Sequence, residues 1–149
     1  MQRESIRVRA IIHGYNFEHV CRESGRGGGV GTYIMSNLKY NILVNSVCHA
    51  ESLWLNIPIG NRSFIVGIVY RKPNTNIDEF QESLLSVLHQ FKIDKRSCVL
   101  MGDFNIDVTT GSSNNNSGHL FTSPLQCLGL EQNNYYHSYT CYEILQNSH

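Results

Sequence analysis

The sequence has no net charge, because its 149 residues include 12 Lys and Arg against 12 Asp and Glu. A strongly basic chain would indicate a nucleic-acid partner by itself, so here any such partner must be argued from a local site. Charged residues make up only 16% of the chain, whereas apolar residues make up 41%, an ordinary share for a folded protein. The composition therefore excludes disorder throughout and predicts a single domain with one sizeable core.

The chain also lacks the sequence features of membrane and secreted proteins. No apolar run reaches the roughly 18 residues of a membrane span, and the Arg-rich residues 1–10 contain no apolar signal segment. The five cysteines are odd in number and form no Cys-x-x-Cys pair, which disfavours a disulfide framework or a zinc site. We therefore expect an intracellular protein with no membrane contact and no disulfide-linked partner.

Short β-strands are expected along most of the chain. Alternating apolar residues predict a half-buried strand over Glu51–Ile59, with Leu53 and Leu55 on one face and Trp54 on the other. A turn at Gly60-Asn61 would join it to a strand over Ser63–Tyr70 in an antiparallel hairpin. Further strands are expected at Val8–Ile12, Val30–Met35 and Cys98–Met101, the last apolar enough to be buried on both faces.

The clearest helical pattern covers Ile77–Phe91, where the apolar residues follow helical spacing and Asn76 can cap the first turn. A second helix at His119–Leu128 would be restricted to one side of Pro124. Loops are expected at Arg22–Gly29 and Gly111–Gly118, and the tail after Asn133 shows only weak periodicity. Strands, a helix and then a buried strand predict a mixed α/β (α+β) sandwich.

The sharpest local feature is Gly102-Asp103-Phe104-Asn105, directly after the predicted buried strand. In extended backbone Asp103 and Asn105 would project together, with Phe104 anchored in the core. A carboxylate beside a neutral amide suits hydrolysis of a phosphate ester, since the carboxylate can take a proton from water or help to bind a metal. The alternative interpretation is an ordinary turn, which Asp and Asn both favour.

A second feature is Tyr70, which ends a predicted strand and precedes Arg71, Lys72 and Pro73. A phenol beside two cations could bind a phosphate. The alternative is a common strand-end tyrosine followed by solvated cations.

The order of these motifs resembles the endonuclease domain of non-LTR (LINE-like) retrotransposons, within the endonuclease/exonuclease/phosphatase superfamily. The resemblance covers residues 14–108 of a single partial domain over residues 1–149. It implies two packed mixed β-sheets flanked by helices, a four-layer sandwich that would be incomplete here. The matching stretches are Gly14-Tyr15, Gly25-Arg26-Gly27-Gly28-Gly29-Val30, Tyr33-Ile34, Glu51-Ser52-Leu53-Trp54-Leu55, Val69-Tyr70-Arg71-Lys72-Pro73-Asn74, Phe80 and Met101-Gly102-Asp103-Phe104-Asn105-Ile106-Asp107.

The same resemblance implies an activity, a cofactor and a partner. The activity is cleavage of phosphodiester bonds in DNA with Mg²⁺ or Mn²⁺, and the location is the nucleus. Tyr70 matches the tyrosine that contacts the scissile phosphate, and Asp103 matches the aspartate that activates the attacking water. Asn105 matches the asparagine that positions the phosphate or the nucleophile, and it would share the metal with Asp103. Arg71 and Lys72 would contact the nucleic acid.

The sequence departs from the family pattern at both ends. The family has an asparagine on its first strand, then a metal-binding glutamate ahead of the Gly-Tyr element, and an Asp-His pair near its C-terminus. Glu4 is the one acidic residue before Gly14-Tyr15, but its surroundings differ from the family's. No Asp-His dipeptide occurs; Ser148-His149 is the nearest match, and His137 stands among tyrosines. Losing a positioned general acid alone typically costs about 10²- to 10⁴-fold in rate.

Three hypotheses therefore remain open at this point. The first is a Mg²⁺-dependent endonuclease domain. The second is a non-catalytic truncated remnant that at most binds nucleic acid. The third is a phosphatase of the same superfamily acting on lipid or sugar phosphates, although the Gly-rich and Tyr-Arg-Lys-Pro-Asn stretches favour the retroelement branch.

Overall fold

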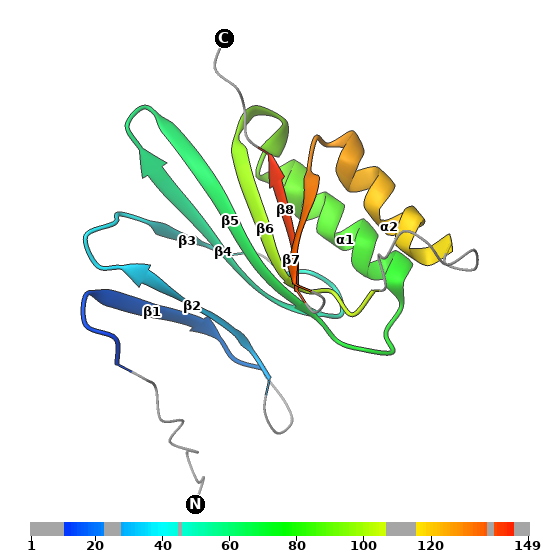
Figure 1. Cartoon of the computed structure of the whole chain (residues 1–149), viewed down its shortest axis with the longest axis horizontal. Helices are drawn as coiled ribbons and strands as arrows, with labels where there is room; N and C mark the ends of the chain where they lie inside the picture. The colour runs from blue at the N-terminus through cyan, green and yellow to red at the C-terminus, as the bar shows by residue number, and fades with distance from the viewer. Residues whose placement is uncertain (1–10, 23–27, 45, 107–115, 137–138, 145–149) are drawn as a thin grey trace, which may run out of the picture.

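The computed structural model describes residues 11–22, 28–44, 46–106, 116–136 and 139–144, with only the backbone described for residues 116–120, 132–136 and 139–144. These residues form two β-sheets and two α-helices (Figure 1). None of the helices in these ranges is long and apolar enough to cross a membrane.

The smaller sheet is an antiparallel pair of β1 (Tyr15–Val20) and β2 (Val30–Met35). Of the predicted loop Arg22–Gly29 between them, residues 23–27 lie outside the described ranges. The larger sheet has six strands in the order β3-β4-β5-β6-β8-β7, in which only β5 and β6 are parallel neighbours. Its strands are β3 (Asn41–Leu43), β4 (Ala50–Ile59), β5 (Arg62–Arg71), β6 (Ser97–Asp103), β7 (Glu131–Tyr136) and β8 (Tyr139–Ile144).

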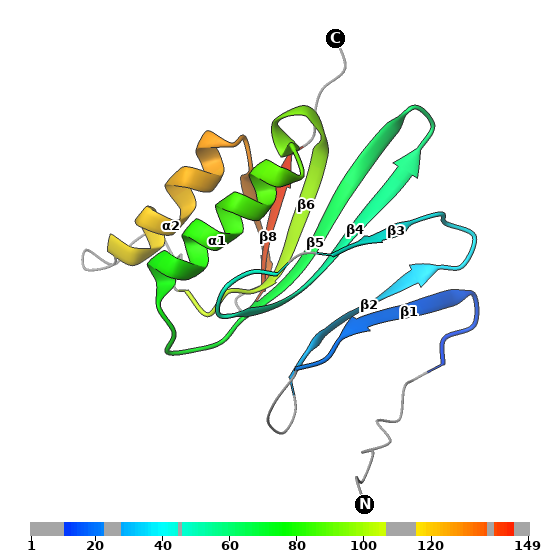
Figure 2. The ribbon, with the colours of Figure 1, turned by 180° about the vertical axis from the view of Figure 1, so that it is seen from behind.

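Both helices cover one face of the larger sheet, as the view from behind shows (Figure 2). Helix α1 (Ile77–Gln90) and the short 3₁₀ helix η1 (Ile93–Lys95) connect β5 to β6, and α2 (Asn116–Cys127) precedes β7. The predicted cap of α1 is confirmed, because the Asn76 side-chain oxygen accepts from the backbone N–H groups of Asp78 at 2.9 Å and Glu79 at 3.2 Å.

Two hydrophobic cores lie on opposite faces of the larger sheet. The main core lies under the helices and includes Trp54, which is fully buried against Gly67 on the neighbouring strand. The smaller core includes Leu53, Leu55 and Ile34 and lies beside β2. The predicted half-buried β4 is therefore wrong for residues 51–55, all of which are buried, because the β1–β2 hairpin covers the face that the helices leave open.

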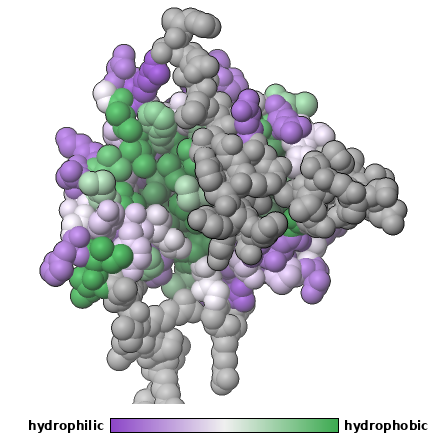
Figure 3. All heavy atoms as spheres, viewed as in Figure 1, coloured by the Kyte–Doolittle hydropathy of each residue, from purple (hydrophilic) through white to green (hydrophobic). Residues whose placement is uncertain are grey.

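Strand β6 is less buried than the sequence predicts. We expected burial on both faces, but Met101 is 38% exposed and Val99 is half-buried. Both residues pair with β5 on the face away from the helices. Figure 3 looks onto this face, and apolar side chains gather there over β4 and β5.

Several boundaries also differ from the sequence predictions. Helix α2 begins at Asn116, inside the predicted loop, and Pro124 lies within the helix instead of limiting it. Of the strand predicted at Val8–Ile12, residues 8–10 lie outside the described ranges, and Ile11 and Ile12 belong to no strand. Strands β1, β3, β7 and β8 were not predicted. The α+β class with two packed sheets is confirmed, with helices flanking the larger sheet in the part of the chain described.

Candidate active site

Glu51, Tyr70 and Asp103 form one row across three neighbouring strands. Tyr70 on β5 pairs with Glu51 on β4 and with Asp103 on β6. Residues paired in this way point to the same face of a sheet, here the face away from the helices. Because neighbouring strands are about 4.8 Å apart, the Cα atoms of Glu51 and Asp103 lie about 10 Å apart with Tyr70 between them. The row therefore places two carboxylates on either side of a phenol, where the parallel strands β5 and β6 end.

Glu51 is 6% exposed and forms an ion pair with Arg22, whose Nε lies 2.5 Å from Oε1. The backbone N–H of Gly29 donates to the other oxygen at 3.4 Å. Burial raises the pKa of Glu51, but the hydrogen bonds from Arg22 and Gly29 and the charges of Arg22 and Lys72 outweigh it, so the pKa is lowered overall. Glu51 is therefore a buried carboxylate that stays ionised.

Arg22 comes from the end of β1, in the loop of the small hairpin, and is 27% exposed. Its hydrogen bond to Glu51 raises the pKa of the guanidinium, and Tyr70 adds a smaller effect in the same direction. The guanidinium thus interacts with two members of the row. A cation at this position would offset the negative charge of a bound phosphate.

Asp103 ends β6, and the chain turns immediately after it. Asn105 has a left-handed backbone with φ of 48°, a conformation that Asn tolerates better than most residues. Its backbone N–H donates to Asp103 Oδ1 at 3.0 Å, and its side-chain amide donates to the carbonyl of Arg71 at 2.7 Å. The backbone is therefore not extended at Asn105, as the expectation that the two side chains project together had assumed, and this hydrogen bond links the two residues instead.

The rest of the Gly-Asp-Phe-Asn motif is explained by packing. Phe104 is 3% exposed and lies in a cluster with Phe80 and Phe121, at ring-centroid distances of 6.2 and 5.6 Å, which confirms its predicted place in the core. Gly102 has φ of +148°, and a Cβ there would lie 1.8 Å from the carbonyl oxygen of Val69. No other residue type fits this close approach of β6 to β5.

Arg71 does not occupy the position expected of a nucleic-acid contact. It is 3% exposed, and its three nitrogens donate to the carbonyls of Phe104 at 2.6 Å, Asn105 at 2.7 Å and Thr75 at 2.9 Å. Burial lowers its pKa, and the charge of Asp103 partly offsets this. Arg71 is therefore a buried residue whose hydrogen bonds hold the loop after Asp103 in place. Lys72 is half-buried, and its role as a nucleic-acid contact stays a prediction.

The donor set can be compared with the needs of Mg²⁺. This ion takes oxygen ligands and is often held by one or two carboxylates, water and substrate phosphates. Asp103 fits such a role, since its carboxylate lies at the open end of β6. Asn105 could offer only its amide oxygen, because its amide nitrogen is bonded to Arg71. Glu51 could serve as a ligand of the ion only if its carboxylate gave up the hydrogen bond from Arg22.

Sequence reasoning missed Glu51 and Arg22 as site residues. The signal for Glu51 was present, because residues equally distant from the Gly60-Asn61 turn pair in the hairpin, and Glu51 falls opposite Tyr70. Arg22 carried no comparable signal, since its contact with Glu51 spans 29 positions. Glu4, His137 and His149 lie outside the described residues.

No protein-family model matches the sequence, and no curated protein matches it either. Solved structures do match. The endonuclease domain of TRAS1, a telomere-specific non-LTR retrotransposon, aligns with a TM-score of 0.66 and 16% identity, over 88% of this chain and 67% of that domain. The human Nocturnin catalytic domain with bound sulfate aligns at 0.57 and 13%, over 87% of this chain and 60% of its own length.

An endonuclease/exonuclease/phosphatase family protein from Bacteroides thetaiotaomicron also aligns at a TM-score of 0.57 and 13% identity, over 87% of this chain and 61% of its own length. The chain thus spans about 60 to 67% of the length of these three structures. It has the fold of the endonuclease/exonuclease/phosphatase superfamily, and the retrotransposon endonuclease domain is among its structural neighbours.

Proposed function

We propose that this chain is a metal-dependent phosphodiesterase domain of retrotransposon origin that nicks DNA. The observation that carries the proposal is the row of Glu51, Tyr70 and Asp103 at the ends of adjacent strands. A phosphodiester bound over Tyr70 would have one carboxylate on each side and the Arg22 guanidinium close by. Carboxyl ends of parallel strands are a common position for ligand sites in α/β sheets.

Each residue of the row has a distinct proposed role. Asp103 accepts a proton from the attacking water, as an ionised carboxylate at the open end of β6 can do. The Tyr70 hydroxyl donates a hydrogen bond to a phosphate oxygen, and Arg22 offsets charge that develops on the phosphate. Mg²⁺ or Mn²⁺, when bound through Asp103, would supply further charge neutralisation. Asn105 acts in this proposal mainly by fixing Asp103, through its backbone N–H at 3.0 Å.

DNA is the proposed substrate because the fold is shared with the TRAS1 endonuclease domain, the structural neighbour with a TM-score of 0.66. The Nocturnin and Bacteroides neighbours show that the same fold occurs in other members of the superfamily. A phosphatase acting on phosphate monoesters is therefore the competing enzyme, and a non-catalytic nucleic-acid binder is the competing non-enzyme.

The direct test is nicking of supercoiled plasmid by the purified chain, with Mg²⁺ or with a chelator. The Asp103→Ala variant should lose metal-dependent nicking, by about 10²-fold or more. The matched control is Asp94→Ala. Asp94 is exposed in η1, which precedes the start of β6, whereas Asp103 lies at the end of that strand. A phosphate monoester and a phosphate diester should be assayed in parallel.

The outcomes separate the three candidates. Nicking that requires metal, survives Asp94→Ala and disappears in Asp103→Ala supports the endonuclease. Turnover of the monoester alone replaces it with a phosphatase. A folded protein with no turnover of plasmid, monoester or diester contradicts the catalytic proposal and leaves only binding.

A further inference from the structure

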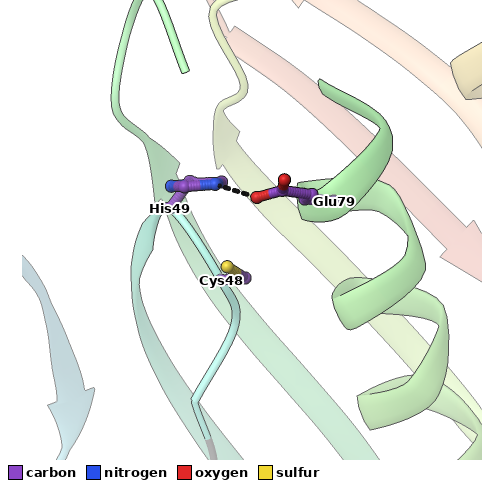
Figure 4. Close-up of side chains that lie close together, drawn as sticks. All are labelled: Cys48, His49 and Glu79. Atoms are coloured by element: carbon purple, nitrogen blue, oxygen red, sulfur yellow. Dashed lines mark hydrogen bonds and ion pairs between the residues drawn. The ribbon is translucent and has the colours of Figure 1, made fainter. Parts of the chain in front are cut away.

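We propose a second metal site, for Zn²⁺ or a similar transition ion, formed by Cys48, His49 and Glu79. One donor atom from each side chain lies within 4.8 Å of the others. His49 Nε2 is 2.6 Å from Glu79 Oε2, and Figure 4 shows the imidazole facing the carboxylate with the Cys48 sulfur nearby. Among the residues whose side chains are described, this is the one group of three such ligands so close together.

The backbone holds Cys48 and His49 so that both can serve one ion. Neighbouring residues in extended backbone point in opposite directions, but His49 has φ of 59° in the turn before β4. Three hydrogen bonds fix this turn: Ala50 N–H to the Val47 carbonyl at 3.3 Å, Cys48 N–H to Ser83 Oγ at 2.9 Å and Lys72 N–H to the His49 carbonyl at 2.9 Å. Both ligands therefore lie toward α1 without further folding of the chain.

Glu79 is positioned separately by the first turn of α1. The Asn76 side chain donates to Glu79 Oε1 at 3.3 Å, which leaves Oε2 for His49. Tetrahedral zinc, with bonds of about 2.0–2.3 Å, places its donor atoms about 3.3–3.6 Å apart. The His49–Glu79 distance must therefore open and the sulfur must approach. Side chains that are 32% and 58% exposed at His49 and Glu79 have room for these small rotations.

The ligand types select the class of ion. A thiolate, an imidazole and a carboxylate together suit Zn²⁺, whereas Mg²⁺ prefers oxygen ligands only. Three protein ligands leave a fourth position for water. A surface pocket of about 460 Å³, lined by Cys48, Glu79, Glu82 and Ser83 among other residues, gives water that access. The Cys48 thiol would release its proton to solvent when the ion binds.

An ion at this site would connect elements that also support the proposed active site. Cys48 and His49 precede β4, Glu79 belongs to α1, and the His49 carbonyl is bonded to Lys72 at the end of β5. Binding to the folded chain alone stabilises it by mass action. Zn²⁺ should therefore raise the unfolding temperature, whether or not the chain cleaves DNA.

The test is titration of the reduced, full chain with Co²⁺, followed by absorbance. We expect a thiolate-to-cobalt charge-transfer band in the near ultraviolet and visible bands typical of tetrahedral coordination, both displaced by Zn²⁺. Cys48→Ser should abolish the charge-transfer band. His49→Gln and Glu79→Gln should each weaken binding by about 10- to 100-fold or more, the range seen for loss of even an outer-shell partner.

The matched controls are Cys127→Ser, His89→Gln and Glu131→Gln, which replace exposed residues of the same types outside the cluster. These three variants should bind Co²⁺ as the parent chain does. A folded parent chain with no charge-transfer band, or a band that persists in Cys48→Ser, would overturn the proposal. Plasmid nicking is not measured in this titration, so its result tests the second metal site independently of the proposed nuclease activity.

Discussion

Replacing Arg71 should destabilise the chain more than any other single change of a charged residue in the described ranges. Arg71 is 3% exposed, and its guanidinium holds the loop after Asp103 by donating hydrogen bonds to the carbonyls of Phe104 and Asn105. The Arg71→Met variant keeps much of the side-chain volume but removes every donor. The carbonyls of Phe104, Asn105 and Thr75 would then lose their partners at once.

The size of the effect follows from the burial of each bond. The bond to Phe104 is buried, whereas those to Asn105 and Thr75 are partly buried and can be replaced by water. A hydrogen bond from a charged donor contributes about 1.5–3 kcal/mol, and a buried acceptor left without its partner costs about 1–3 kcal/mol. We expect a loss of about 3–5 kcal/mol in the free energy of unfolding, a large share of the total for one domain.

Urea unfolding followed by circular dichroism measures this loss directly. Arg71→Lys should also destabilise, because one ammonium group cannot reproduce a planar set of donors. Arg62→Met is the matched control, since Arg62 is exposed at the start of β5, and it should change stability by less than about 0.5 kcal/mol. A loss below about 1 kcal/mol for Arg71→Met would refute the view that this side chain braces the loop.

Three further predictions follow from the site and the core. Gly102→Ala should lower the free energy of unfolding by more than about 2 kcal/mol, because a Cβ would lie 1.8 Å from the Val69 carbonyl oxygen. Gly60→Ala, where a Cβ meets nothing within 4 Å, should lower it by about 1 kcal/mol. Equal losses in urea unfolding would contradict this difference. Burial raises the pKa of Cys98 to about 12, so in the metal-free native chain a thiol reagent at about pH 8 should label the exposed Cys21, Cys48 and Cys127 but Cys98 only after unfolding. Rapid native labelling of Cys98, detected by peptide mass spectrometry, would refute its burial. The pKa of Glu51 is lowered in the folded chain, so its contribution to stability is complete above the ordinary value of 4.5 and is lost as the pH falls through the lowered value. The stability difference between the parent chain and Glu51→Gln should therefore shrink below pH 4.5. A difference that stays constant there would contradict the ion pair with Arg22.

Local patterns in the sequence predicted the parts of the fold that local forces determine. Helix α1 and its Asn76 cap, the β4–β5 hairpin and the place of Phe104 in the core all match the structure. In each case the signal lies within a few residues: helical spacing, a cap, a turn or an apolar residue between two polar ones.

The errors have a common physical cause, which is tertiary packing. Alternation in β4 indicated one buried face, but the distant β1–β2 hairpin buries the other. The apolar run in β6 indicated two buried faces, yet no described element covers Met101 on the open face. Pro124 lies within α2, where we expected a helix end. The polar strands β7 and β8 pair along an existing sheet and carry little periodicity of their own.

The candidate site divides in the same way. Tyr70 and Asp103 could be proposed from the sequence because each lies at the end of a recognisable strand, and the structure pairs them on neighbouring strands. Arg22 and the Cys48–His49–Glu79 cluster join segments about 30 positions apart, so no spacing rule could reveal them. The odd number of cysteines and the lack of a Cys-x-x-Cys pair disfavoured a zinc site, but neither feature bears on a cysteine next to a histidine that faces a helix.

We propose that Glu51, Tyr70 and Asp103 form one site that binds a metal ion and a phosphodiester together. The most direct measurement is a crystal structure with Mn²⁺ and a short DNA oligonucleotide, with the ion located by anomalous scattering. We expect an ion on the Asp103 carboxylate and a backbone phosphate within hydrogen-bond distance of the Tyr70 hydroxyl. An ion and a phosphate bound away from this row, with Asp103 and Tyr70 touching neither, would contradict it.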